Sequence, residues 1–346
     1  MTLTEVAPQP TDTRIIVLQH NEAEGFLAVT YPTLHRHEGS ANIVLAHALA
    51  RASSECALTA CRFTTDADIQ LPCPAPPIPA QTFWLTVWSH RGRSKPALDM
   101  VLSCLDSRFG GYPIFLWTPM QQDLQLPQWL EPRMSKLTAY LHACVAPERV
   151  FSVFSTTALT TAFADKWSAL TGFQINPEPL YTAFSAICTQ QTLSASVSAQ
   201  QGLARRATMR DVEAAGKLCQ EFTNNSEYPL SVAQGAEEAR DLINKGLLWL
   251  TVIGGEVATI CAVSRSSLHV SAITKVYTTP KWRRKGLAQA LLKEVVQRLF
   301  ACGKDSVVLY VGCDNSAQNV YRRAGFLIQN DICLELGFVG ANIGHW

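Results

Sequence analysis

Charged residues are scarce in this chain, and neither sign dominates. Asp, Glu, Lys and Arg make up 16% of the 346 residues, and 29 basic against 28 acidic residues leave a formal net charge of +1. Because such a chain has no global field, we exclude functions that depend on general attraction to nucleic acid or to a membrane surface. The apolar fraction of 47% and the length favour well-buried cores in two domains.

Metal-binding and redox motifs are also missing. The 11 cysteines form no C-x-x-C pair and no Cys/His cluster at zinc spacing. HRHE, His35 to Glu38, lacks an evident third ligand at workable spacing, so we expect a polar helix face there and no metal. Scattered cysteines of this kind indicate reduced thiols in the cytoplasm.

Targeting and membrane signals are absent too. The segment MTLTEVAPQPTDT has no apolar core of a signal peptide, and no apolar run approaches the roughly 18 residues of a membrane span. We expect a flexible tail over residues 1–13, no membrane partner and a cytoplasmic location.

The remaining sequence predicts two α/β domains, 14–195 and 205–346, which meet at the small, polar segment Leu193–Ala204. The first domain contains a proline-rich loop, Leu71–Ala80. Its expected strands are Arg14–Gln19, Thr82–Ser89 and Tyr112–Thr118, and its expected helices are Ala41–Ala52, Leu130–Cys144 and Leu159–Leu170.

The second domain has sharper local signals. Thr208–Asp211 has the form of a capping box before a helix that ends near Phe222. A helix over Ala233–Lys245, a hairpin about Gly254-Gly255, a strand over His269–Thr279, a helix from Leu287, a strand over Ser306–Val311 and a short helix that ends at Gly325 follow in order. Asp314 or Asn315 is the expected N-cap of the short helix.

The stretch VYTTPKWRRKGLA, Val276 to Ala288, has the composition of a phosphate site. A helix start exposes unpaired N–H groups and the positive end of its dipole. Arg283, Arg284 and Lys285 add cations there, and Gly286 lets the backbone approach an anion closely. The sequence has neither the Walker nor the dinucleotide motif, and no G-x-S-x-G of a serine hydrolase. A solvated basic loop is the alternative.

Two motifs together resemble the GNAT superfamily of acyl-CoA-dependent N-acyltransferases, over about Arg206 to Phe338. The first is R-x-x-G-x-[GA], here Arg283, Gly286 and Ala288. The second is Y-x-x-x-G-F, here Tyr321, Gly325 and Phe326. The resemblance implies an α/β fold with a GNAT-type mixed, splayed central β-sheet flanked by helices.

The resemblance also implies a site for acetyl-CoA between the splayed strands. Val276 and Thr278 would offer backbone groups to the pantetheine arm, the amides of Arg284 to Ala288 would hold the pyrophosphate, and Asn315 or Asn319 would bind pantetheine amides. The asparagine usual in the family falls nearer Asp314. The implied coenzyme-contacting residues are Val276, Tyr277, Thr278, Arg283, Arg284, Lys285, Gly286, Leu287, Ala288, Asn315 and Asn319.

Acyl transfer to an amine needs a proton for the departing thiolate, a stabilised oxyanion and a base. Tyr321 is our candidate acid, with a core tyrosine as the alternative, and the Val276 N–H is our candidate oxyanion donor. No carboxylate lies in the strand Leu268 to Thr279. His269, Glu227 and Glu256 are therefore base candidates by elimination only, beside a water chain or an amine of low pKa.

The first domain carries traces of the second at an offset of 153 residues. Gly325-Phe326 matches Gly172-Phe173, and PKW ending at Trp282 matches PQW ending at Trp129. We interpret the first domain as a degenerate copy of the same fold, with chance as the competing explanation. Leu130, Arg133 and Ser168 occupy the positions of Arg283, Gly286 and Tyr321, so the copy would hold no coenzyme and would shape the acceptor pocket.

The sequence thus predicts an N-acetyltransferase that moves an acetyl group from acetyl-CoA directly to a primary amine of a small molecule or peptide. A coenzyme A-binding sensor or scaffold protein without turnover is the alternative from another class. A longer acyl donor also stays open.

Overall fold

The computed structural model describes residues 13–53, 69–92, 94–121, 126–194, 203–224, 226, 229–342 and 344. We refer to residues 13–194 as the N-terminal half and to residues 203–344 as the C-terminal half. The predicted tail, apart from Thr13, and most of the predicted domain border lie outside the described residues.

The two halves have the same order of main elements. The N-terminal half contains β1 (Thr13–His20), α1 (Ala23–Arg36), α2 (Glu38–Leu49), β2 (Phe83–Arg91), β3 (Ala97–Cys104), the small β4 (Asp106–Ser107) and β5 (Gly110–Gly111), β6 (Ile114–Trp117), α4 (Pro127–Cys144), β7 (Ser152–Thr156), α5 (Thr157–Thr171) and β8 (Tyr181–Thr189).

The C-terminal half contains β9 (Leu203–Arg206), α6 (Val212–Thr223), α7 (Val232–Asn244), β10 (Leu248–Ile253), β11 (Glu256–Ser266), β12 (Val270–Thr278), α8 (Leu287–Ala301), β13 (Ser306–Gly312), α9 (Gln318–Ala324) and β14 (Leu327–Gly337). Apart from the β4–β5 hairpin and short 3₁₀ turns, both halves read β-α-α-β-β-β-α-β-α-β.

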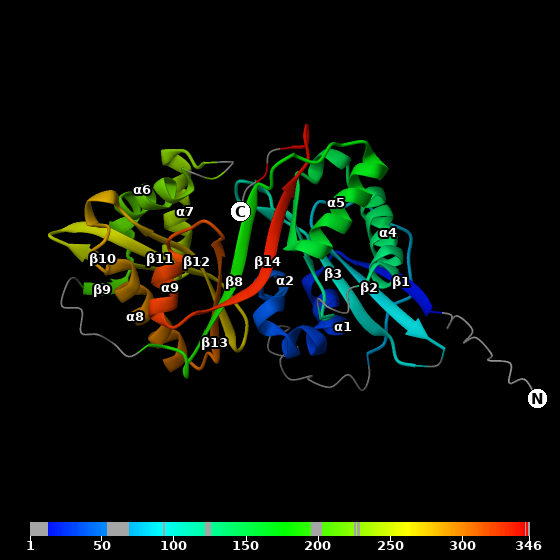
Figure 1. The fold of residues 1–346 in the computed structure, drawn as a ribbon, viewed down its shortest axis with the longest axis horizontal. Helices are drawn as coiled ribbons and strands as arrows, with labels where there is room; N and C mark the ends of the chain where they lie inside the picture. The colour runs from blue at the N-terminus through cyan, green and yellow to red at the C-terminus, as the bar shows by residue number, and fades with distance from the viewer. Residues whose placement is uncertain are drawn as a thin grey trace, which may run out of the picture.

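One continuous sheet of 12 strands joins the halves, in the order β1-β2-β3-β6-β7-β14-β8-β13-β12-β11-β10-β9. This order is symmetric about the β14–β8 pair, because the halves exchange their last strands. β14 of the C-terminal half pairs with β7, and β8 of the N-terminal half pairs with β13. Figure 1 shows these two strands side by side between the halves.

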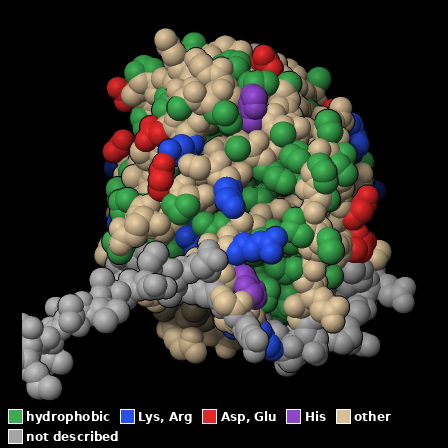
Figure 2. Space-filling view, turned by 90° about the vertical axis from the view of Figure 1, so that its right-hand side faces the viewer, with side chains coloured by type: hydrophobic (Ala, Val, Ile, Leu, Met, Phe, Trp, Pro, Cys, Tyr) green, Lys and Arg blue, Asp and Glu red, His purple; other side chains and the backbone are tan. Residues whose placement is uncertain are grey.

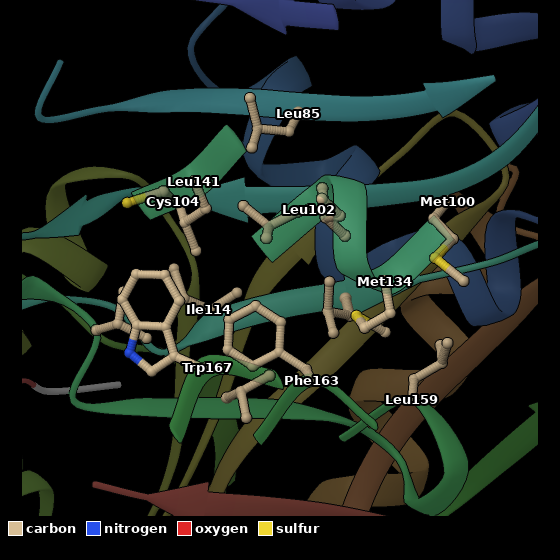
Figure 3. Close-up of a cluster of buried hydrophobic side chains, with 14 of the residues drawn as sticks. Leu85, Met100, Leu102, Cys104, Ile114, Met134, Leu141, Leu159, Phe163 and Trp167 are labelled. Atoms are coloured by element: carbon tan, nitrogen blue, oxygen red, sulfur yellow. The ribbon is translucent and has the colours of Figure 1, made fainter. Parts of the chain in front are cut away.

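Helices cover both faces of the sheet in each half. In the N-terminal half, α4 and α5 close one apolar core over β2, β3 and β6, with Met134, Phe163 and Trp167 fully buried (Figure 3). In the C-terminal half, α6 and α7 pack on one face of the sheet, and α8 and α9 pack on the other. The two faces of β12 therefore meet different helices.

Polar contacts also join the halves. Glu38, at the start of α2, accepts hydrogen bonds from Ser267 Oγ at 2.6 Å and from the His269 N–H at 3.0 Å. Arg108, between β4 and β5, pairs with Asp241 on α7 at 2.5 Å. α2 and the β4–β5 hairpin of the N-terminal half therefore lie against the α6/α7 side of the C-terminal half.

The face of the N-terminal half that points away from the C-terminal half mixes hydrophobic side chains with both signs of charge (Figure 2). Among the described residues, none of the helices combines the length and the hydropathy that crossing a lipid bilayer requires.

The predicted α/β fold is confirmed, with a mixed sheet flanked by helices and a second α/β unit of the same element order. The sequence did not indicate α1 or the strands β3, β7, β8, β9 and β14. The short helix α9 begins at Gln318, later than predicted, and Asn315 accepts the N–H of Ala317 at 2.9 Å in the turn before it.

Candidate acyl-coenzyme A site

A gap opens between β12 and β13. These parallel strands are joined by three residue pairs only, the last of which is Ala272 with Val308. β12 continues to Thr278 along β11, whereas β13 continues along β8. The free edge of β12 from Ile273 to Thr278 is about 17 Å long.

The backbone register of β12 decides which of its groups face this gap. The Thr279 N–H donates to Ala258 O at 3.0 Å, and Thr259 Oγ1 donates to Tyr277 O at 2.7 Å, so Thr279 and Tyr277 face β11. Backbone groups of successive residues in a strand point to opposite edges. Val276 and Thr278 therefore present theirs to the gap.

The loop after β12 has the backbone shape of an anion site. The 3₁₀ turn Pro280–Trp282 leads into Arg283, and then Arg284 (φ 63°) and Gly286 (φ 76°) are left-handed. Alternating conformations of this kind make successive N–H groups converge. α8 starts without a side-chain cap, and its first internal bond runs from the Ala290 N–H to Gly286 O. The N–H groups of Leu287 to Gln289 therefore have no acceptor within the helix.

The basic side chains of the loop differ in their partners. Arg283 folds back on the strand, where its Nε donates to Thr278 O at 3.0 Å and its Nη2 to Tyr277 Oη at 3.1 Å. Lys285 lies 4.3 Å from the centre of the Trp282 ring. Arg284 and Lys285 are exposed. Arg283 fixes the loop to β12, and its neighbours are the cations that face solvent.

The other predicted coenzyme-contacting residues differ in burial and in hydrogen bonding. Leu287 is buried and anchors α8, and Ala288 is half-buried beside it. Asn315 uses its side-chain oxygen within the turn before α9, and Asn319 is exposed. Asn319 therefore has the freer side chain.

Tyr321 lies in α9 on the α8/α9 side of the sheet. It is 8% exposed and packs edge-on against Phe326, with the ring centres 5.9 Å apart. Burial raises the pKa of the phenol well above its usual range, and the nearby Cys261 and Tyr181 add to the effect. Cys261 is the strand partner of Val276, and both belong to the apolar cluster around Tyr321. The phenol is thus a protonated group on the side of β12 where Val276 lies.

Two of the base candidates, His269 and Glu256, lie among the described residues, and they do not converge on this region. His269 precedes β12 and pairs with Asp305 at 3.0 Å, about 23 Å along the strand from Val276. Glu256 is exposed at the β10–β11 turn, where hydrogen bonding to Lys281 lowers its pKa. Glu227 lies outside the described residues.

Two carboxylates that sequence reasoning missed pack against β12 from the α6/α7 face. Glu238 on α7 pairs with Lys275 at 3.0 Å, and Lys275 keeps a raised pKa because this carboxylate outweighs the opposing effect of burial. Glu221 on α6 acts on Tyr277, whose pKa is raised by burial and then by this carboxylate. Lys275, a charged residue inside an apolar strand, was the available sequence signal.

The sequence interpretation of HRHE needs a correction, because the fold supplies the third group that it lacked. Ligand atoms of His35, Glu38 and His269 all lie within 4.8 Å of one another. His35 Nδ1 is 2.5 Å from Glu38 Oε1, while Ser267 and the His269 N–H occupy the other oxygen of Glu38. These residues form a polar contact between the halves.

Comparison with known proteins places this geometry in a family. A model described as the acetyltransferase (GNAT) family matches residues 217–326, which include the loop, the gap and Tyr321. A comparison with curated proteins finds no match.

Two solved structures share the fold over almost the whole chain. A GCN5-related N-acetyltransferase from Sphaerobacter thermophilus is 16% identical, with a TM-score of 0.53 over 97% of this chain and 98% of that one. A Drosophila protein is 11% identical, with a TM-score of 0.58 over 95% of this chain and 100% of that one. At these identities the likeness concerns the fold alone. The matched segment, 217–326, is an acetyltransferase domain of the GNAT family.

Proposed function

We propose that this protein transfers an acetyl group from acetyl-CoA to a primary amine, and that the C-terminal half holds both the coenzyme and the chemistry. The observation that carries the proposal is the gap between β12 and β13, which starts after Ala272 and leads to the left-handed loop before α8. The family of residues 217–326 supports acyl transfer in general.

The residues present fit coenzyme A. The N–H groups of Leu287 and Ala288, with the exposed side chains of Arg284 and Lys285, would hold the pyrophosphate. The N–H and C=O of Val276 would pair with the extended pantetheine arm. The carbonyl of Thr278 already accepts a hydrogen bond from Arg283, so Val276 offers the freer pair of backbone groups.

Two groups of the chain, the Val276 N–H and the Tyr321 phenol, would assist the transfer step. Acetyl-CoA, when bound, would supply a thioester whose carbonyl carbon would accept the neutral amine, with coenzyme A as the leaving thiolate. The Val276 N–H would stabilise the oxyanion. Tyr321, which belongs to the same apolar cluster as Val276, would donate its proton to the thiolate.

We also propose Glu238 as the group that accepts the amine's proton, directly or through water. It packs against β12 through Lys275, which precedes Val276 in the strand. It lies on the α6/α7 face, opposite the α8 loop. Acceptor and coenzyme would then approach the gap from opposite faces of the sheet.

The experiment is calorimetric titration with acetyl-CoA of the parent, of Arg283→Ala/Arg284→Ala, and of Lys217→Ala/Arg240→Ala. The control removes two positive charges from exposed positions on α6 and α7. We expect the loop variant to bind at least tenfold more weakly, because charge-assisted hydrogen bonds are each worth about 1.5–3 kcal/mol. The control should match the parent. A parent that does not bind acetyl-CoA, or a loop variant that binds as the control does, would show the proposal to be wrong.

A coenzyme A sensor without turnover is the second candidate, favoured by the absence of a carboxylate from β12 itself. Thiol release in the presence of a panel of amines separates the two functions, because a sensor binds acetyl-CoA and releases none beyond background hydrolysis.

A further inference from the structure

Arg265 on β11 is a buried cation without a counter-charge. It is 8% exposed, and its Nε is buried with no hydrogen-bond acceptor. Within the described part of the chain, no carboxylate forms an ion pair or hydrogen bond with its guanidinium, which lies 5.7 Å from the centre of the Tyr310 ring. Burial lowers its pKa, and yet an arginine stays charged in proteins. A charge in such a place normally has an anionic partner.

The titratable groups around Arg265 are neutral or already paired. Burial, with Arg265 and Arg51 adding to it, lowers the pKa of His47 to about 3. Burial raises the pKa of Tyr112 and of Tyr310, so both phenols keep their protons.

The neighbouring charges do not neutralise the guanidinium either. Lys275 and Glu238, which also act on Tyr112, form their own ion pair at 3.0 Å. Arg51 is exposed and donates to the carbonyl oxygens of His47 and Asp106. Among the residues that the structure describes, the buried part of this cluster therefore keeps one uncompensated positive charge.

The cluster lies at the closed end of the gap. Arg265 pairs with Ala272, which in turn pairs with Val308 in the last pair that joins β12 to β13. Tyr310 follows Val308 by two residues, so both lie on one face of β13. Lys275 lies on the same face of the sheet as Tyr310, toward α7. On this face, α2 of the N-terminal half packs against β11, β12 and β13. The guanidinium is thus beside the end of the gap that is farthest from the phosphate loop, on the acceptor side.

We propose that Arg265 binds a carboxylate of the acceptor, so that the substrate class is an amine that also carries one carboxylate, as amino acids do. A guanidinium fork matches a carboxylate with two parallel hydrogen bonds, and one negative charge balances the one positive charge of the cluster. Tyr112 and His47 come from the N-terminal half, so that half would complete the acceptor site. The inference rests on the proposed function, because it assigns the acceptor of that reaction.

The first test measures acetylation of a panel of amino acids and of their methyl esters by thiol release from acetyl-CoA. For at least one amino acid, kcat/KM should exceed that of its ester by about 30-fold or more, as expected for a charge-assisted pair. Arg265→Gln should remove this preference by raising KM for the acid, with little effect on the ester. Arg265→Lys should retain part of the preference for the acid over the ester.

A second readout separates recognition from a structural role. Arg265→Met removes an unpaired buried charge, so its urea midpoint should equal or exceed that of the parent. If Arg265 instead stabilised the fold, the urea midpoint of Arg265→Met would be lower than that of the parent. Acetyl-CoA affinity of all three variants should stay within threefold of the parent's. If the parent binds acetyl-CoA but does not favour acids over esters, or Arg265→Met loses stability, this inference alone is wrong. If the parent fails to bind acetyl-CoA, the proposed function fails, and the inference with it.

Discussion

The two halves differ at the start of the helix that follows β6 in one half and β12 in the other. In the C-terminal half, Pro280–Trp282 is a separate turn, and a left-handed loop precedes α8. In the N-terminal half, Pro127 to Trp129 already form the first turn of α4. The start of α8 is thus preceded by a loop with exposed basic residues, whereas the corresponding residues of the N-terminal half belong to the helix α4 itself.

What replaces the loop in the N-terminal half is a packing interaction. Arg133, at the position of Gly286 by the 153-residue offset, is 5% exposed and pairs with Asp99 at 2.8 Å. Its guanidinium also lies 4.6 Å from the centre of the Trp129 ring. The two halves thus keep the same element order, while the left-handed loop of one half is replaced by a buried ion pair in the other.

The largest expected difference between the halves follows from removing the proposed proton donor in one half and the corresponding side chain in the other. Tyr321→Phe should lower kcat about 100-fold, in the range of general acid catalysis, with acetyl-CoA affinity unchanged. Ser168→Ala, at the corresponding position of α5, should change neither. Steady-state thiol release and calorimetry measure both. Equal rates for Tyr321→Phe and the parent would leave Tyr321 as a core residue.

A second prediction compares two substitutions that introduce similar backbone strain, one in each half. Gly286 has φ 76° and Gly172 has φ 80°, and at neither would a Cβ meet an atom within 4 Å. Valine should cost about 1–2 kcal/mol of stability at either site, because an L-residue is strained in the left-handed region. Acetyl-CoA affinity should fall about tenfold in Gly286→Val and stay unchanged in Gly172→Val. Calorimetry and urea unfolding test this, and a similar loss of affinity in both variants would contradict it.

A third effect concerns the first helix of each half and bears on stability alone. Asp211 accepts the Thr208 N–H at 2.7 Å and pairs with Arg205, whose hydrogen bonds hold its pKa well below the usual range against the opposing effect of burial. In the N-terminal half, the N-cap residue Glu22 makes no side-chain cap bond. Asp211→Asn should therefore destabilise the protein by about 1–2 kcal/mol at pH 7, and Glu22→Gln should not.

The stability that Asp211 contributes should depend on pH. Because the folded carboxyl has the lower pKa, the unfolded chain binds more protons as pH falls below the unfolded value of about 3.9. The stability from Asp211 is present above that pH and is lost as the pH falls through the folded value. Urea unfolding at pH 7 and pH 3 should show a smaller difference between parent and Asp211→Asn at pH 3. An equal difference at both values would argue against the ion pair as the cause.

Prediction from sequence succeeded where neighbours in the chain decide the structure. The hairpin at Gly254-Gly255, the apolar face of α8 and the glycine before it follow from local backbone preference and periodicity. It failed for α1, which contains Pro32, and for β8 and β14. A proline inside a helix weakens its local signal. The burial pattern of β14 does not alternate regularly, so its strand signal is weak as well.

By itself the sequence determined the basic, glycine-containing loop before α8, its place between a strand and a helix, and the tyrosine of α9, because these depend on residues within a few positions of one another. Only the tertiary structure decided the exchange of β8 and β14, the contact of Glu38 with Ser267, and the cluster around Arg265. Those features join residues far apart in the chain. Their hydrogen bonds and unbalanced charge exist only once both halves have folded against each other.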